Sequence, residues 1–298
     1  MTDSADRDTA DWDIASGVGL TALATAACRA VETLREPPLV RDPYAGAFVQ
    51  AARAPTPMPV TPQEADGDQT FPWPEFARYV GVRSRLFDEL SLTAVADGLR
   101  QVVILAAGLD TRAFRLDWPP GVTAYEVDAP RVLAFKDQVL AGAGARPRCA
   151  RRAVLADLRG RWTPALLTAG LDPASPVAWL AEGLLPYLSD EEKDRLLAGM
   201  RELSAPGSRI AIEHFAGMDS MRDYAAFTEA PRLNNVDFDV TALWAHEEAT
   251  DPGPWLARIG WSVDARPIAD VAAGYGRPLP ATLPEGMLSA VMITARLT

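Results

Sequence analysis

The sequence predicts an α/β protein built on a doubly wound, Rossmann-like sheet with a helical segment in front of it. The stretch Gln101 to Asp128 has the pattern of strand, glycine turn, helix start, connection and second strand. Short apolar stretches then alternate with helical ones as far as Glu213. The last two strand-like stretches, Trp261 to Ala265 and Leu288 to Leu297, are joined by a long connection and fit a closing antiparallel hairpin.

The first strand is the apolar run Val102 to Leu105, which is short and β-branched and therefore typical of a strand buried on both faces. The small residues Ala106 and Gly108 follow it and allow backbone amides to come close to a ligand. Asp128 ends the second strand roughly 20 residues later, where a carboxylate can accept both hydroxyls of a ribose. We interpret this unit as the nucleoside-binding half of the sheet, although an ordinary buried strand and glycine turn would have the same pattern.

The turn after the first strand favours one class of nucleoside over another. Its sequence, AAGLDT, contains a single glycine, so the three-glycine fingerprint of dinucleotide-binding proteins is absent. A pyrophosphate binds across bare backbone at a helix N-terminus, and Asp110 at that position would repel it. The sulfonium and the ribose of S-adenosylmethionine carry no such penalty. The turn therefore favours S-adenosylmethionine over a nicotinamide dinucleotide.

Composition and charge restrict the partners. A chain of 298 residues with 48% hydrophobic content suits one large domain, or a core with an appendage. A net charge of −11 and a pI near 4.8 argue against nucleic acid and against an anionic membrane surface. Two cysteines, Cys28 and Cys149, and two histidines, His214 and His246, predict neither a disulfide framework nor a metal site. No signal peptide or long apolar run is present, so we expect a cytoplasmic protein, either a monomer or a homodimer.

The first hundred residues show helical periodicity and no strand that would pair in a sheet. Apolar residues from Ile14 to Leu34 repeat on one helical face, and Phe76 to Leu99 is predicted to be helical again. Four prolines and a glycine between positions 54 and 68 predict a flexible loop. We therefore divide the chain into a helical cap at 1–99 and a cofactor-binding core at 100–298.

The core is expected to alternate helices and strands and to contain a polar insertion at 215–250 after its fifth strand. The other expected elements are a helix at Pro130–Leu140, a strand at Cys149–Ala156, a strand at Pro176–Ala181, a helix at Asp190–Leu203, a strand at Gly207–Glu213 and a helix that ends at Trp255–Gly260.

Several motifs in this order resemble the leucine carboxyl methyltransferase family. The resemblance is strongest to its bacterial branch of S-adenosylmethionine-dependent methyltransferases, which occurs in actinobacteria and in polyketide pathways. It extends from about Asp11 to the C-terminus. The motifs that carry it are ILAAGLDTRAFRL, YEVDAPRVLAFK, LADLR and WLAEGLLPYL, together with DWDIASGVGLTALATAACRA, RDPYAGAF and VGVRSRLFDEL nearer the N-terminus.

The resemblance implies a class I methyltransferase fold in which an N-terminal cap covers the cofactor. It also implies that Arg83 holds the carboxylate of the methionine moiety and that Glu182, at the end of the fourth strand, contacts its amine. Asp157 and Leu158, which close the third strand, would border the adenine. Simpler alternatives remain for two of these residues, since Arg83 also fits a solvated helix arginine and Asp157 a helix N-cap.

In class I methyltransferases an insertion after the fifth strand commonly builds the acceptor pocket, and we expect 215–250 to do so here. Tyr224, Phe227 and Trp244 are spaced through this segment. They would line a pocket for a planar or hydrophobic acceptor, or simply pack the insertion.

The expected activity is methyl transfer from S-adenosylmethionine to a small molecule, at a carboxyl or hydroxyl oxygen, in secondary metabolism. A carboxylate acceptor needs no base, whereas a hydroxyl acceptor needs one. His214, beside Glu213, is the best candidate for that base, although it also fits a structural histidine. Tyr187 is a candidate for lining the acceptor pocket or for an ordinary surface position. The alternatives are C-methylation of an electron-rich ring such as an indole, a non-catalytic nucleoside-binding module, and an NAD(P)-dependent reductase.

Overall fold

The computed structural model describes residues 14, 17–54, 57–69, 71–215 and 251–298. Within them, seven strands form one sheet in the order β3-β2-β1-β4-β5-β7-β6. The first five strands pair in parallel, and β7 runs antiparallel to both of its neighbours. The predicted class I methyltransferase fold with its closing antiparallel hairpin is confirmed. The strands are β1 (Gln101–Leu105), β2 (Thr123–Asp128), β3 (Ala150–Leu155), β4 (Val177–Ala181), β5 (Arg209–Phe215), β6 (Trp261–Pro267) and β7 (Ala290–Leu297).

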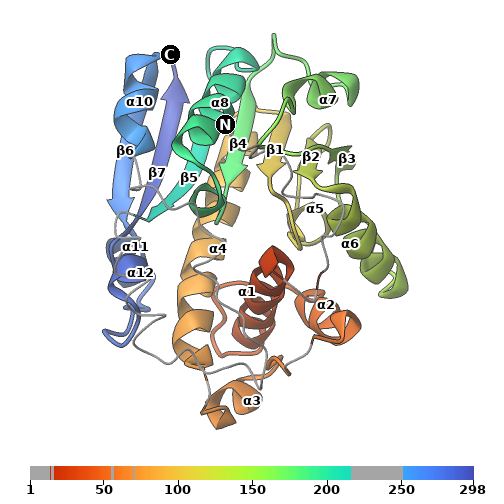
Figure 1. Ribbon diagram of the computed structural model, residues 1–298, viewed down its shortest axis with the longest axis vertical. Helices are drawn as coiled ribbons and strands as arrows, with labels where there is room; N and C mark the ends of the chain where they lie inside the picture. Colours follow the sequence, from red (N-terminus) through yellow and green to blue (C-terminus); the bar gives the residue numbers. More distant parts are fainter. Residues whose placement is uncertain (1–13, 15–16, 55–56, 70, 216–250) are drawn as a thin grey trace, which may run out of the picture.

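The central strands are buried on both faces because helices cover the sheet on both sides (Figure 1). Alternate residues of a strand point to opposite faces. In β1, Val102 and Ile104 belong to one hydrophobic cluster, whereas Val103 and Leu105 belong to another. The first cluster includes residues of α4, α6 and α11, and the second includes residues of α7, α8 and α10.

The helices around the sheet hold their positions through these two clusters. They are α1 (Gly17–Thr33), α2 (Ala45–Ala52), α3 (Pro62–Gly67), α4 (Trp73–Ala96), α5 (Arg112–Arg115), α6 (Pro130–Gly142), α7 (Thr163–Thr168), the 3-10 helix η2 (Leu185–Tyr187), α8 (Asp190–Glu202), α10 (Pro252–Arg258), α11 (Ile268–Gly274) and α12 (Glu285–Leu288).

The N-terminal residues form helices that gather beyond the carboxyl ends of the parallel strands (Figure 1). The prediction of a flexible loop at 54–68 was wrong for its second half, where α3 forms. Thr61 caps this helix: its hydroxyl accepts a hydrogen bond from the amide of Glu64, and the Glu64 carboxylate accepts one from the amide of Thr61. Pro62 occupies the first helical position, where its missing N–H has no cost.

One long helix connects the N-terminal helices to the sheet. The 24 residues of α4 begin beside α1 and α3 and end against β4 and β5. Residues of α1, α4 and β1 accordingly belong to the same hydrophobic cluster.

In the part of the chain that the structure describes, no helix is long and apolar enough to cross a membrane. The insertion was predicted at 215–250; Phe215 is the last residue of β5, and the rest of the insertion, with Tyr224, Phe227 and Trp244, lies outside the described residues.

Candidate active site

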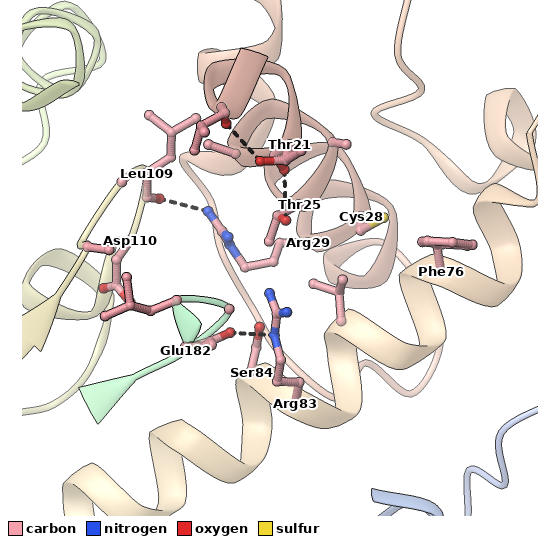
Figure 2. A pocket seen from close by; sticks show the side chains of 18 of the residues that line it. Thr21, Thr25, Cys28, Arg29, Phe76, Arg83, Ser84, Leu109, Asp110 and Glu182 are labelled. Atoms are coloured by element: carbon pink, nitrogen blue, oxygen red, sulfur yellow. Dashed lines mark hydrogen bonds and ion pairs between the residues drawn. The ribbon is translucent and has the colours of Figure 1, made fainter. Parts of the chain in front are cut away.

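A cavity of 490 Å³ lies at the carboxyl ends of β1, β2 and β4, between these strand ends and the helices α1 and α4 (Figure 2). Its size falls within the range of about 300–1,000 Å³ that is usual for small-molecule sites. Ligands of open α/β sheets bind at this end of the strands. The cavity has one strongly charged region and one apolar region.

The turn after β1 forms the floor of the charged region. Ala106 and Gly108 both have positive φ angles, of 49° and 43°. This turn directs the amide of Gly108 to the Asp128 carboxylate, which accepts its hydrogen bond at 2.6 Å. The other oxygen of Asp128 accepts from the amide of Ala129 at 2.7 Å. Burial raises the pKa of Asp128 above its ordinary value of 3.8, although both amide hydrogen bonds act in the opposite direction.

Arg83 and Glu182 meet across the charged region (Figure 2). The Nε of Arg83, on α4, donates to Oε1 of Glu182, which follows β4, at 2.8 Å. The Nη1 of the same guanidinium lies 3.1 Å from Oε2 of Glu213, on β5. Glu213 in turn accepts a 2.7 Å hydrogen bond from the hydroxyl of Tyr79.

Arg112 extends this network behind Glu182. Its Nη1 lies 2.8 Å from Oε2 of Glu182, and it also forms ion pairs with Asp110 and Asp88. Burial acts to raise the pKa of Glu182, but the positive charges of Arg112 and Arg83 outweigh it, so the pKa is lowered. The same opposition holds for Asp110, whose pKa falls to about 2 because of Arg112, Lys136 and Arg115. Both carboxylates are therefore ionised at neutral pH.

A third arginine ties the first helix to the turn after β1. Arg29, on α1, donates from Nη2 to the carbonyl oxygen of Leu109 at 2.7 Å and pairs through Nε with Asp42 at 2.8 Å (Figure 2). The hydroxyl of Thr111 also donates to Asp42. These contacts join the N-terminal helices to the loop that follows β1.

The apolar region of the cavity is lined from α1, α4 and the segments before and after them. Phe71 packs against Phe76, with ring centroids 4.5 Å apart. Phe76 lies nearer the start of α4 than Arg83, away from Glu182 (Figure 2). Tyr187, on η2, contacts α1 through a 3.2 Å hydrogen bond to the hydroxyl of Thr21. Val18, Leu20, Met58 and Met287 complete this side of the cavity.

The structure brings most of the predicted site residues together. The cavity is lined by Arg83, Ala106, Gly108, Asp128, Glu182 and Tyr187.

Asp157, Leu158 and His214 do not belong to the described lining of this cavity. Asp157 follows β3 and forms an ion pair with Arg159 at 2.8 Å, whereas Leu158 is buried in the hydrophobic cluster on the far face of the sheet. His214 is also buried, and burial lowers its pKa. Since Glu213 points toward α4, its neighbour His214 points to the opposite face.

Three charged residues of the site were not predicted from the sequence, although each carries a signal. Arg29 interrupts the apolar run of the first helix, Arg112 follows Asp110 at the start of a helix, and Glu213 lies within the largely apolar strand β5. A charge in such surroundings needs a partner, because burying it alone is costly.

Several known proteins are similar to this chain in sequence. The family model of leucine carboxyl methyltransferases matches residues 22–201. A protein of Saccharopolyspora erythraea named "Putative S-adenosyl-L-methionine-dependent methyltransferase" is 48% identical over 286 residues, which cover 96% of this chain and 97% of that protein. A protein of the same description from Rhodococcus jostii is 45% identical over 281 residues and covers 93% of each chain.

Among solved structures, a methyltransferase described as putative from Thermobifida fusca superposes with a TM-score of 0.49 at 18% identity, over 91% of this chain and 94% of its own. The extent of the family match and the identity to the Saccharopolyspora protein are decisive. The chain belongs to the leucine carboxyl methyltransferase family and is an S-adenosyl-L-methionine-dependent methyltransferase.

Proposed function

We propose that this methyltransferase modifies a small molecule of secondary metabolism at an oxygen atom. The observation that carries the proposal is the division of the cavity. One region presents buried charges at the strand ends, and the other presents the aromatic rings of Phe71 and Phe76. The charged region suits the cofactor, and the apolar region suits a ring-containing acceptor.

The residues of the charged region fit S-adenosylmethionine by their charges. Arg83 matches the carboxylate of the methionine moiety, and Glu182 matches its ammonium group. Asp128 is held by two backbone amides at the end of β2 and matches the hydroxyls of the ribose. Ala106 and Gly108 supply the turn that passes beneath the cofactor.

Asp157 and Leu158 are proposed to border the adenine. They follow β3, the strand that pairs with β2, and Leu155 at the end of β3 is in register with Asp128. The adenine would then lie beyond the ribose, on the side of Asp128 where β3 ends.

The bound sulfonium supplies an activated methyl group, so the protein's task is to align the acceptor with it and exclude water. Tyr187 is proposed to contact the acceptor, because η2 places it beside α1 in the cavity. His214 points to the opposite face of the sheet from Glu213. Of the two candidate catalytic residues, Tyr187 is therefore the better placed.

The charges around the cavity favour a hydroxyl over a carboxyl acceptor. Among the residues that the structure describes, four arginines line the cavity, and each of the four is already paired with a carboxylate. The pairs are Arg29 with Asp42; Arg83 with Glu182 and Glu213; Arg112 with Asp88, Asp110 and Glu182; and Arg115 with Asp88. A neutral acceptor needs no additional cation, whereas a buried carboxylate does.

The proposal is tested by incubating the protein with S-adenosylmethionine and one of three bicyclic aromatic compounds: 2-naphthol and 2-naphthoic acid, which differ only in the reacting group, and indole, which offers a ring carbon. Mass spectrometry locates the added methyl group. A methyl ether supports the hydroxyl assignment, and a methyl ester alone would leave only the carboxyl form of O-methylation. Methylation at a ring carbon of indole, with neither oxygen compound modified, would contradict O-methylation.

A further inference from the structure

Arg83 and Glu182 each have a second partner of opposite charge behind them. Glu213 lies 3.1 Å behind the guanidinium of Arg83, and Arg112 lies 2.8 Å behind the carboxylate of Glu182. The side chains of Glu213 and Arg112 are 0% and 3% exposed. The four residues therefore form a row of alternating charges, with the Arg83–Glu182 pair in its centre.

Arg112 and both residues of the central pair line the cavity, whereas Glu213 is not part of its described lining. A ligand with both a carboxylate and an ammonium group would compete for the two halves of the central pair. If Arg83 and Glu182 had only each other, separating them would leave a buried cation and a buried anion to be matched by the ligand alone. With Glu213 and Arg112 in place, each half of the central pair would still have a partner of opposite charge if the two halves separated.

We propose that Glu213 and Arg112 are positioning residues for the amino-acid end of the cofactor. Glu213 holds the guanidinium of Arg83 in place for the ligand carboxylate, and Arg112 holds Glu182 for the ligand ammonium. The inference rests on the proposed roles of Arg83 and Glu182, and it adds the two residues that act through them.

The surroundings of Glu213 support this role. It lies on a buried strand between Ile212 and His214, and its carboxylate receives the Tyr79 hydroxyl and the Arg83 guanidinium. Burial raises its pKa, and the nearby negative charge of Glu182 adds to this, whereas Arg83 and Tyr79 lower it. Glu213 therefore takes up a proton at a higher pH than an exposed glutamate and, once neutral, holds Arg83 less firmly.

The test compares two ligands that share the nucleoside and the thioether. S-adenosylhomocysteine has the amino-acid end, and 5′-methylthioadenosine lacks it. Titration calorimetry with Glu213→Gln should show affinity for S-adenosylhomocysteine reduced by about tenfold or more, the scale of a lost charged hydrogen bond. Affinity for 5′-methylthioadenosine should change by less than about twofold, since that ligand makes no use of Arg83.

Two comparison variants make the result specific. Arg83→Met should show the same selective loss, and Glu89→Gln should leave both affinities unchanged because Glu89 belongs to an exposed ion pair with Arg85 on α4. In the wild type, the affinity for S-adenosylhomocysteine divided by that for 5′-methylthioadenosine should fall toward acid pH as Glu213 takes up a proton. In Glu213→Gln this ratio should not depend on pH. The titration of Asp128 affects the binding of both ligands equally and therefore cancels in the ratio.

The variants of Glu213 and Arg83 distinguish a failure of the positioning role from a failure of the proposed cofactor site. An equal loss for both ligands, or no loss, in Glu213→Gln overturns the positioning role while Arg83→Met still tests the proposed cofactor site. If Arg83→Met shows no selective loss, the assignment of Arg83 fails and the inference fails with it. If Glu213→Gln does not fold, Glu213→Asp replaces it: this variant keeps the charge but withdraws it from Arg83, and it should show a smaller loss of the same selectivity.

Discussion

Arg29 and Leu109, which are 80 residues apart, are joined by a 2.7 Å hydrogen bond from the guanidinium to the main-chain oxygen. The contact links the first helix of the chain to the turn that carries Gly108. It is buried, and the same guanidinium neutralises Asp42. Besides its apolar packing, α1 is therefore fixed beside the cavity by a buried polar contact.

Substitution of Arg29 by methionine should destabilise the protein. The variant leaves the fully buried carboxylate of Asp42 without its cation, and the loss of one partner of a buried ion pair costs about 3–5 kcal/mol. Urea unfolding followed by circular dichroism measures the change. Arg41→Met, at an exposed position, serves as the control and should change the free energy of unfolding by less than about 0.5 kcal/mol. Equal stability of the two variants would contradict the role of Arg29.

Substitution of Asp128 by asparagine should weaken cofactor binding, and the NH2 group takes the place of one of the two oxygens that accept from the amides of Gly108 and Ala129. The neutral amide loses the charge that strengthens hydrogen bonds to the ribose hydroxyls, and we expect a loss of about 1–3 kcal/mol in binding free energy. Calorimetric titration with S-adenosylhomocysteine measures it. Asp117→Asn is the matched control, because the side chain of Asp117 is 93% exposed. Unchanged affinity in Asp128→Asn would remove Asp128 from the ribose site.

The affinity for S-adenosylhomocysteine should also depend on pH through Asp128. Binding needs the ionised carboxylate, and burial raises the pKa of Asp128, so affinity falls as the pH is lowered through a value above 3.8. The effect on folding has the opposite sign. The folded state binds this proton more tightly than the unfolded state, so the contribution of Asp128 to stability is complete below pH 3.8 and is lost as the pH rises through the raised pKa.

The pH titration is measured by calorimetry at several pH values, with 5′-methylthioadenosine as the ligand so that the methionine end does not contribute. Asp128→Asn should remove this acid limb from the profile. A limb of unchanged size and midpoint in the variant would assign it to another group.

Substitution of Gly199 by alanine should destabilise the packing of α8 on the sheet. A Cβ at this position would lie 2.7 Å from Cζ2 of Trp162 and 2.9 Å from Cγ2 of Thr163. Trp162 is fully buried and packs edge-on against Trp179, so it has little room to move. We expect a cost of about 1–3 kcal/mol, as in other overpacked cores.

Thermal or urea unfolding measures the effect at Gly199. Gly142→Ala is the control, because no atom lies within 4 Å of a Cβ added at Gly142. It should be neutral or stabilising by about 0.5–1 kcal/mol, since alanine is the better helix former. A Gly199→Ala variant as stable as the wild type would show that the Trp162 side chain can shift to make room for the added methyl group.

The strands were predictable from the sequence because the pattern that indicates a strand is contained in a few consecutive residues. Buried strands are short apolar runs, and β1 and β4 lie within a residue of the predicted bounds at each end. The helix α3 was missed because it is too short to show apolar periodicity, and its signal is confined to the capping pair Thr61 and Glu64. The reductase and non-catalytic alternatives were wrong, as the family assignment shows.

The site was only partly predictable, for a different reason. Both faces of β5 are buried, so the sequence does not indicate whether Glu213 or His214 points toward α4. The partners of Arg29, Arg83 and Arg112 come from distant parts of the chain, and only the tertiary fold brings them together. The roles of the individual residues in binding and catalysis stay predictions until the variants are measured.

The hydrophobic cluster that joins α1, α4 and β1 couples the N-terminal helices to the sheet. Arg83 and Arg29 are supplied by the N-terminal helices, and Asp128 and Glu182 are supplied by the sheet. A ligand that contacts both groups binds only when both are folded, so its binding free energy adds to the stability of the N-terminal helices. Amide hydrogen exchange in α1 should therefore slow when S-adenosylhomocysteine is added. The N-terminal helices and the sheet should fold as one cooperative unit.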